Sequence, residues 1–108
     1  LMTGGGRILN VLSIAAEVAF PGAAAYSAAK AGLRQFGKCI QAEFRHQGVV
    51  VTNVLPGATR TEIWGSGGPD PTDMIPPSAV AETLAWLLDQ PADRAIDEIT
   101  VMPPKGIL

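Results

Sequence analysis

Three short apolar runs, separated by two helical patterns, limit most strongly what this chain can fold into. The runs are rich in Val, Ile and Leu, are bounded by glycine or proline, and cover Arg7–Ser13, Val49–Leu55 and Glu98–Met102. Because their hydrophobicity is nearly continuous rather than alternating, they predict strands of a parallel sheet that is covered on both faces. The order strand, helix, strand, helix, strand is typical of an α/β layered fold.

Two helical patterns lie between the predicted strands. The first predicts a helix from about Ala23 to His46, which Gly48 ends as a C-terminal stop. Steps of about 100° per residue put a stripe of apolar side chains on one face of this helix, which we expect to face the core. The stripe comprises Ala29, Leu33, Phe36, Ile40 and Phe44. A polar arc on another face comprises Arg34, Lys38, Gln41 and Arg45.

The second helical pattern runs from about Ser78 to Asp89, with Ser78 expected as its N-cap. Its expected buried face comprises Val80, Leu84, Leu87 and Leu88. The preceding segment, from Trp64 to Pro77, is rich in glycine and proline and does not predict regular structure. Such a segment is typical of a functional loop, a lid or a mobile region. Within it, Asp70 and Asp73 are expected to be solvated acids rather than substrate contacts.

The length and charge of the chain exclude several classes of protein. Its 108 residues suit one small domain, and its net charge of −2 argues against nucleic acid or an anionic membrane as the main partner. The apolar stretch 11–31 is interrupted by Glu17 and Pro21, so it does not predict a membrane-spanning helix. The single cysteine, Cys39, permits no internal disulfide and is expected to pack as a small hydrophobe. We therefore expect a cytoplasmic protein.

A tyrosine and a lysine four residues apart form the most distinctive chemical pattern. Tyr26 and Lys30 fall on one side of the first predicted helix, at the border of its apolar stripe. A free tyrosine has a pKa of about 10, and a nearby cation favours the phenolate, so such a pair is suited to acid/base exchange. Ser13, at the end of a predicted strand, supplies a hydroxyl suited to hold a carbonyl oxygen. A surface tyrosine stacked on a lysine stem has the same spacing, so the pair alone decides nothing.

Together with their surroundings, these residues resemble the short-chain dehydrogenase/reductase family. The matching segments are Asn10–Ser13, Tyr26–Lys30, Pro56–Thr61, 75–82 and 98–101. The similarity covers essentially the whole chain, as the C-terminal half of such a protein. It implies a Rossmann-type, NAD(P)-binding fold with a parallel sheet, of which residues 1–108 hold only the last three strands and their helices.

The resemblance implies catalytic roles for three residues. Tyr26 would give a proton in reduction and take one in oxidation, Lys30 would stabilise its phenolate and bind the nicotinamide ribose, and Ser13 would orient the substrate oxygen. The substrate would be an alcohol or a carbonyl compound. The loop residues after Ser13, from Glu17 to Phe20, lie where the family has its substrate pocket, and ordinary loop packing explains them equally well.

The resemblance also implies a nicotinamide site in the turn after the second strand. Pro56 and Gly57 would bring the backbone close to the nicotinamide. The amide of Thr59 and the hydroxyl of Thr61 would hold its carboxamide, although the family commonly has a β-branched apolar residue where Thr59 stands. The implied cofactor is NADP or NAD, with NADP favoured by the general look of the C-terminal segments.

Two other sequence features resemble parts of ligand-binding sites but do not predict such a site here. The glycines Gly4–Gly6 are followed by a strand, whereas a phosphate-binding turn needs a helix after its glycines. The chain has one histidine, His46, at a helix end and one cysteine apart from it, so no metal site is predicted.

Two functions remain open from the sequence. One is an NAD(P)-dependent oxidoreductase represented by its catalytic half, with the N-terminal cofactor-binding half absent, so that these 108 residues alone are expected to be inactive. The other is a truncated, non-catalytic Rossmann-like remnant or interaction module. Both predict a homo-oligomer, because the chain would leave a strand edge and apolar helix faces uncovered. Family members usually pair through the helix that carries the tyrosine and lysine.

Overall fold

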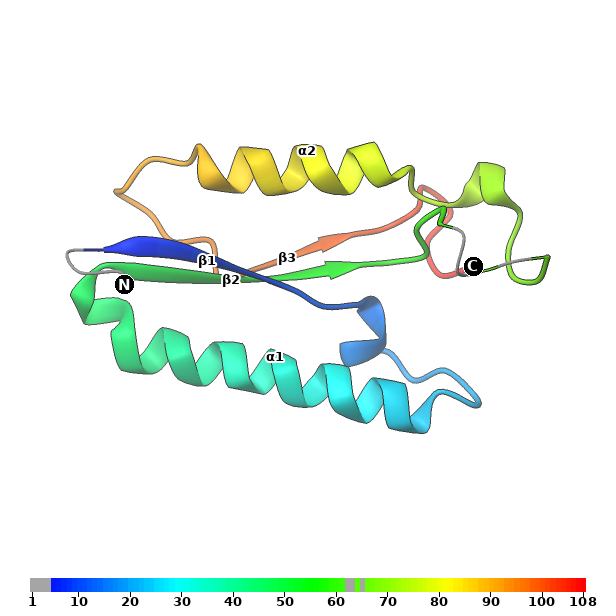
Figure 1. The fold of residues 1–108 in the computed structure, drawn as a ribbon, viewed down its shortest axis with the longest axis horizontal. Helices are drawn as coiled ribbons and strands as arrows, with labels where there is room; N and C mark the ends of the chain where they lie inside the picture. The colour runs from blue at the N-terminus through cyan, green and yellow to red at the C-terminus, as the bar shows by residue number, and fades with distance from the viewer. Residues whose placement is uncertain (1–4, 62–63, 65) are drawn as a thin grey trace.

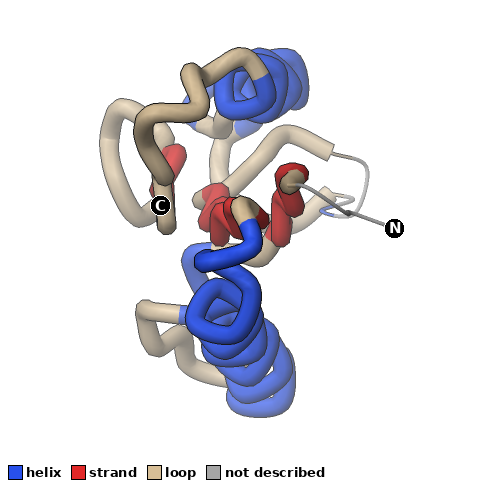
Figure 2. The backbone as a smooth tube through the Cα atoms, turned by 90° about the vertical axis from the view of Figure 1, so that its left-hand side faces the viewer, coloured by secondary structure: helices blue, strands red, loops and turns tan. Residues whose placement is uncertain are grey.

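The computed structural model describes residues 5–61, 64 and 66–108. Its centre is a parallel sheet with the strand order β1-β2-β3. The main elements are β1 (Gly6–Val11), α1 (Ala24–Phe44), β2 (Val49–Pro56), α2 (Pro77–Leu88) and β3 (Glu98–Val101). Helix α1 lies on one face of the sheet and α2 on the other (Figure 1), and Figure 2 shows the strands between the two helices. The predicted α/β fold with a parallel sheet is confirmed.

The first strand and the first helix end close to the predicted positions. β1 stops at Val11, because the side chain of Ser13 accepts a hydrogen bond from the backbone of Ala15 and begins the short 3₁₀ turn η1 (Ile14–Ala16). Helix α1 passes into a second 3₁₀ turn, η2 (Arg45–Gln47). Gly48 then ends the helical segment with a φ of 80°, as expected for a left-handed stop.

Helix α2 begins earlier than predicted and without a side-chain cap. Pro77 is its first residue and Pro76 its N-cap, so the prediction that Ser78 caps this helix was wrong. A proline suits the first helical position because its φ is preset and its missing N–H needs no partner there. Leu87 is buried as predicted, whereas Leu88 is 57% exposed, contrary to the prediction.

The apolar stripe of α1 faces away from the sheet, which corrects the prediction from helical periodicity. Phe36 is 60% exposed, and Leu33 and Phe44 are exposed as well. The buried residues of α1 are instead Gly37 and Gln41. Of the predicted polar arc, Gln41 and Arg34 therefore pack toward the sheet, whereas Lys38 and Arg45 are exposed.

Side-chain amides explain this orientation of α1. Asn53, fully buried in β2, donates from Nδ2 to the carbonyl oxygen of Arg34 (3.0 Å) and accepts at Oδ1 from Nδ2 of Asn10 (3.0 Å). Gln41 donates to a backbone carbonyl of β2 at 2.6 Å. A Cβ on Gly37 would lie 2.2 Å from Oδ1 of Asn53, so only a glycine fits there. Buried polar groups require partners, and α1 turns its polar face inward to supply them.

A bidentate ion pair joins α1 to β3. Nε and Nη2 of Arg34 donate to the two carboxylate oxygens of Glu98 at 2.7 and 2.8 Å, and both side chains are largely shielded from solvent. The hydrogen bonds from Arg34 lower the pKa of Glu98, and the same pairing raises the pKa of Arg34. Directional bonds therefore hold α1 against both β2 and β3.

Three further expectations concern Cys39, the glycine run before the first strand, and membrane-spanning helices. Cys39 is exposed on α1, so the prediction that it packs in the interior was wrong. Gly4 lies outside the described residues, whereas Gly6 begins β1, which confirms that a strand follows the glycines. None of the helices in the described part of the chain is long and apolar enough to cross a membrane.

Candidate active site

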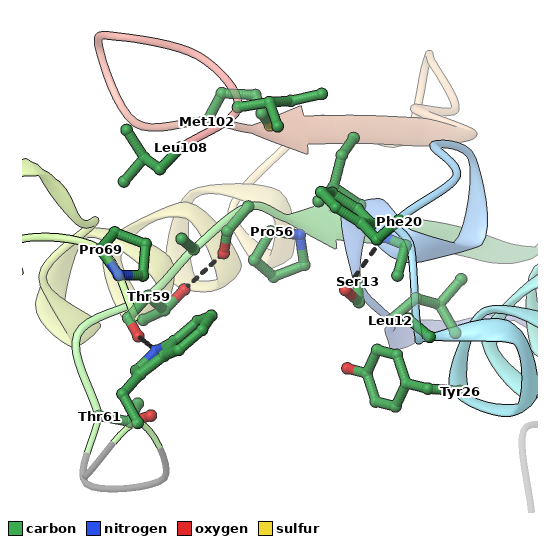
Figure 3. Close-up of a pocket in the computed structure, with 17 residues that line it drawn as sticks. Leu12, Ser13, Phe20, Tyr26, Pro56, Thr59, Thr61, Pro69, Met102 and Leu108 are labelled. Atoms are coloured by element: carbon green, nitrogen blue, oxygen red, sulfur yellow. Dashed lines mark hydrogen bonds between the residues drawn. The ribbon is translucent and has the colours of Figure 1, made fainter. Parts of the chain in front are cut away.

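A cavity of about 650 Å³ opens where the three strands end. Parallel strands bring their carboxyl ends to one edge of the sheet, and ligands of open α/β sheets bind at that edge. Its lining includes six residues that the sequence had marked as candidates, namely Ser13, Tyr26, Pro56, Gly57, Thr59 and Thr61. Figure 3 shows Ser13 and Tyr26 on one side of this cavity and Thr59 and Thr61 on the opposite side.

Ser13 is fixed by the turn that follows β1. Its Oγ accepts a hydrogen bond from the backbone N–H of Ala15 at 3.1 Å, which holds the side chain at the rim of the cavity. Because Oγ is the acceptor in this bond, the hydroxyl hydrogen is available to donate to an oxygen atom of a ligand.

Tyr26 lies in the first turn of α1, with its phenol directed into the cavity (Figure 3). The side chain is 52% exposed, so a ligand can reach it. Lys30, one turn later, places Nζ 5.6 Å from the centroid of the Tyr26 ring. The spacing that suggested a pair therefore gives a cation over an aromatic face. Lys30 itself is outside the lining of the cavity.

The turn after β2 is held tightly on the opposite side. Gly57 donates its N–H to the carbonyl oxygen of Val101 at 2.7 Å, and Thr59 donates its hydroxyl to the carbonyl oxygen of Gly57 at 3.0 Å. A Cβ on Gly57 would lie 2.9 Å from Sδ of Met102 and 2.9 Å from Cδ of Pro103. These neighbours leave no room for a side chain at this position, and Gly57 itself lines the cavity.

The acids of the loop before α2 bind parts of the chain itself. The carboxylate of Asp70 accepts hydrogen bonds from the N–H and the hydroxyl of Thr72 at 2.9 and 2.8 Å, which lowers the pKa of Asp70. Asp70 caps the short turn η4 (Pro71–Asp73), and Asp73 pairs with Nζ of Lys105 at 3.0 Å. Over the described ranges, His, Cys, Asp and Glu side chains form no group of three that could hold a metal ion.

Comparison with known sequences identifies the family. Residues 1–71 match the sequence profile of the family described as short chain dehydrogenase. The chain belongs to this family. The parallel strands with helices on both faces are accordingly part of a Rossmann-type fold, and the homologues of this short-chain dehydrogenase are oxidoreductases.

Two curated relatives and one solved structure show how far the similarity extends. An oxidoreductase of Staphylococcus aureus (strain MW2), described as uncharacterized, is 31% identical over 98 residues, covering 91% of this chain and 42% of that protein. A 3-oxoacyl-[acyl-carrier-protein] reductase of Synechocystis is 38% identical over 94 residues, covering 81% and 38%. An alcohol dehydrogenase of the archaeon Thermococcus sibiricus, solved with 5-hydroxy-NADP, has a TM-score of 0.80 and 25% identity, covering 93% and 43%. This short-chain dehydrogenase therefore spans about two fifths of the length of its relatives.

Several residues that line the cavity of this short-chain dehydrogenase were not found from the sequence. They are Leu12, Ile14, Trp64, Pro69, Met102, Ile107 and Leu108 among others. Met102 had a usable signal, because it directly follows β3 and the ends of parallel strands meet at one edge. Of the residues in the loop after Ser13, Phe20 lines the cavity. Nothing in the sequence pattern points to the last two residues of the chain.

Proposed function

We propose that this chain carries the proton-handling part of an oxidoreductase that transfers hydride between NAD(P)(H) and an alcohol or carbonyl compound. The observation that carries the proposal is the cavity itself, where Ser13 from the end of β1, Tyr26 from α1 and the turn after β2 face one another. These groups come from three separate elements, and two hydroxyls on one wall suit a single carbonyl oxygen.

In this proposal Tyr26 is the general acid and base. A bound nicotinamide supplies hydride to the carbonyl carbon in reduction and accepts it in oxidation. Tyr26 gives its phenolic proton to the substrate oxygen in reduction and takes it back in oxidation. Ser13 donates its hydroxyl hydrogen to the same oxygen and stabilises the negative charge that develops there.

The proposed nicotinamide position is against the turn after β2. Gly57 lines the cavity and has no side chain of its own to stand between its backbone and a flat ring. Pro56, Thr59 and Thr61 surround it, and the threonines supply amide and hydroxyl groups for a carboxamide. Lys30 would contact the ribose. We favour NADP over NAD, and the 5-hydroxy-NADP held by the Thermococcus sibiricus enzyme supports a nicotinamide cofactor.

We also propose that copies of the chain associate through α1. The apolar stripe of this helix is turned away from the sheet, and Phe36, Leu33 and Phe44 are exposed on it. A second copy that places the same stripe against it would remove these side chains from water. Family members usually pair through the helix that carries the tyrosine and lysine, which supports α1 as the interface.

Replacement of Tyr26 by phenylalanine tests the reaction. Tyr26→Phe removes one hydroxyl and keeps the ring under Lys30, so we expect turnover to fall by about 10²–10⁴-fold, the usual contribution of a general acid or base. Turnover is followed through the absorbance of NADPH, and NADPH binding through its fluorescence. Ser27→Ala is the matched control, because it removes a hydroxyl from the next residue of α1, which does not line the cavity.

The two measurements separate the possible outcomes. Lost turnover with retained NADPH binding in Tyr26→Phe supports the proposal. Undiminished turnover in Tyr26→Phe would remove Tyr26 from its role. Because these 108 residues alone are expected to be inactive, both measurements are made with the N-terminal half of a relative joined to the chain. Absence of both NADPH binding and turnover there would favour a non-catalytic remnant.

A further inference from the structure

Among the residues that the structure describes, the side chains lining the cavity are apolar except for the hydroxyls of Ser13 and Tyr26 and the two threonines. Among the lining side chains of the described residues, none carries a formal charge at neutral pH. Figure 3 shows Phe20 on the side of Ser13, with Pro69 across the cavity and Leu108 and Met102 along its upper wall. A charged group that contacts these walls would meet apolar side chains and no ionic partner among the described lining residues.

Trp64 forms a fixed part of this apolar wall. Its indole Nε1 donates to the carbonyl oxygen of Thr59 at 2.9 Å. The other side of the ring lies against Gly68, where a Cβ would come within 2.5 Å of Cε3 of the indole. Gly68 also has a φ of 91°, a backbone conformation that favours glycine. The indole is therefore held both by a hydrogen bond and by a position that excludes any side chain.

Trp64 also separates two different environments. It lines the apolar cavity and, in addition, a smaller cavity of about 260 Å³ whose lining includes Arg60 and Asp70. The indole thus lines both the cavity that holds the Ser13 and Tyr26 hydroxyls and the cavity that holds Arg60 and Asp70. Removing the indole would join the two cavities, so that larger substrates and charged groups could enter.

We propose that the cavity selects an uncharged carbonyl compound or alcohol with an aliphatic or aromatic body, and that Trp64 sets this selectivity. The inference rests on the proposed oxidoreductase function and narrows its substrate class. The hydroxyls of Ser13 and Tyr26 engage the single oxygen, and the apolar walls receive the remainder of the molecule.

A pair of ketones that differ in one charge tests the substrate class. With the N-terminal half of a relative joined to it, we expect the chain to reduce benzylacetone with a kcat/KM about a hundredfold higher than its para-carboxy derivative, a difference of about 2.8 kcal/mol. Trp64→Ala should reduce this preference about tenfold, or about 1.4 kcal/mol, because the carboxylate then reaches the side of Arg60. Trp86→Ala is the matched control, since this tryptophan is half exposed on α2 and outside both cavities. It should leave the preference unchanged.

Folding is checked by circular dichroism, and Trp64→Phe serves if the alanine variant does not fold. Phenylalanine keeps an apolar ring but loses the bond to Thr59, so the preference for the neutral ketone should fall less than in Trp64→Ala. An unchanged preference in every folded Trp64 variant would overturn the role of Trp64. Equal or better use of the carboxylate by the unsubstituted chain would overturn the substrate class, while Tyr26-dependent turnover in that assay would leave the proposed reaction intact.

Binding decides the substrate class if neither ketone is reduced. The chain has two tryptophans, so a Trp86→Phe variant leaves Trp64 as the only indole fluorophore. Quenching by benzylacetone but not by its carboxy derivative supports the apolar selectivity, and only the proposed reaction then fails. Absence of quenching by both, or quenching by the carboxylate alone, overturns the selectivity.

Discussion

Two glycines on the same helix should respond in opposite directions to replacement by alanine. Gly32 and Gly37 both lie inside α1, and a helix gains about 1 kcal/mol when alanine replaces an interior glycine. At Gly32 a new Cβ meets no atom within 4 Å, so Gly32→Ala should stabilise the fold by about 0.5–1 kcal/mol. At Gly37 the new Cβ would lie 2.2 Å from Oδ1 of Asn53, a distance that no structure tolerates.

The magnitude at Gly37 follows from the bonds that Asn53 makes. To relieve the overlap, its amide must rotate or α1 must lift away, and either movement breaks the bonds to Asn10 and to the carbonyl of Arg34. Each buried polar group left without a partner costs about 1–3 kcal/mol. Two such losses, offset by about 1 kcal/mol of helix propensity, leave Gly37→Ala destabilised by about 1–5 kcal/mol.

Urea unfolding followed by far-UV circular dichroism measures both changes. With similar slopes for both variants, the midpoint of unfolding should rise for Gly32→Ala and fall for Gly37→Ala relative to the parent chain. If Gly37→Ala unfolds at the same or a higher urea concentration than Gly32→Ala, α1 does not rest on the asparagine pair, and the inward polar face described for this helix is wrong.

Two further predictions concern charge and association. The hydrogen bonds from Arg34 depress the pKa of Glu98, so the stabilisation that they give is fully present above the ordinary glutamate pKa of about 4.3 and is lost as the pH falls through the lower pKa of the folded state. In the Glu98→Gln variant, the urea midpoint should therefore decline less as the pH is lowered. An unchanged decline would show that this ion pair is not its cause. Phe36→Glu should lower the sedimentation-derived mass of any homo-oligomer formed through α1, whereas Gln35→Glu, with the same new charge on a neighbouring exposed residue, should not; equal effects would argue for charge repulsion alone.

The strands and helices of this fold were predictable because the sequence patterns that specify them are local. Nearly continuous apolar runs predicted β1, β2 and β3, and Gly48 marked the end of the first helical segment. The face of α1 was not predictable in the same way. Helical periodicity finds a stripe of like side chains but does not say whether the sheet opposite is apolar, and here the sheet presents Asn10 and Asn53.

The residues of the candidate site were likewise only partly predictable from the sequence. Ser13, Tyr26 and the turn after β2 were suggested by motifs that resemble a family, and the structure brings them to one cavity. The segment that begins at Trp64 was expected to be a functional loop, a lid or a mobile region, but Trp64 itself was not singled out, because its position depends on a bond to Thr59 and on the missing side chain of Gly68. Such contacts form between turns and leave no pattern in the sequence.

The polar contact of α1 also bears on how the site is positioned. Apolar side chains pack without a fixed direction, so a helix on an apolar sheet can shift along it at little cost. Bonds from Asn10 to the carbonyl of Leu33, and from Asn53 to that of Arg34, fix the helix both along its axis and in its rotation. Tyr26 lies about two turns before these anchors on the same rigid helix. We infer that the asparagines of the sheet set where the phenol of Tyr26 enters the cavity. The apolar stripe faces outward because the inward face of α1 makes these hydrogen bonds to the sheet.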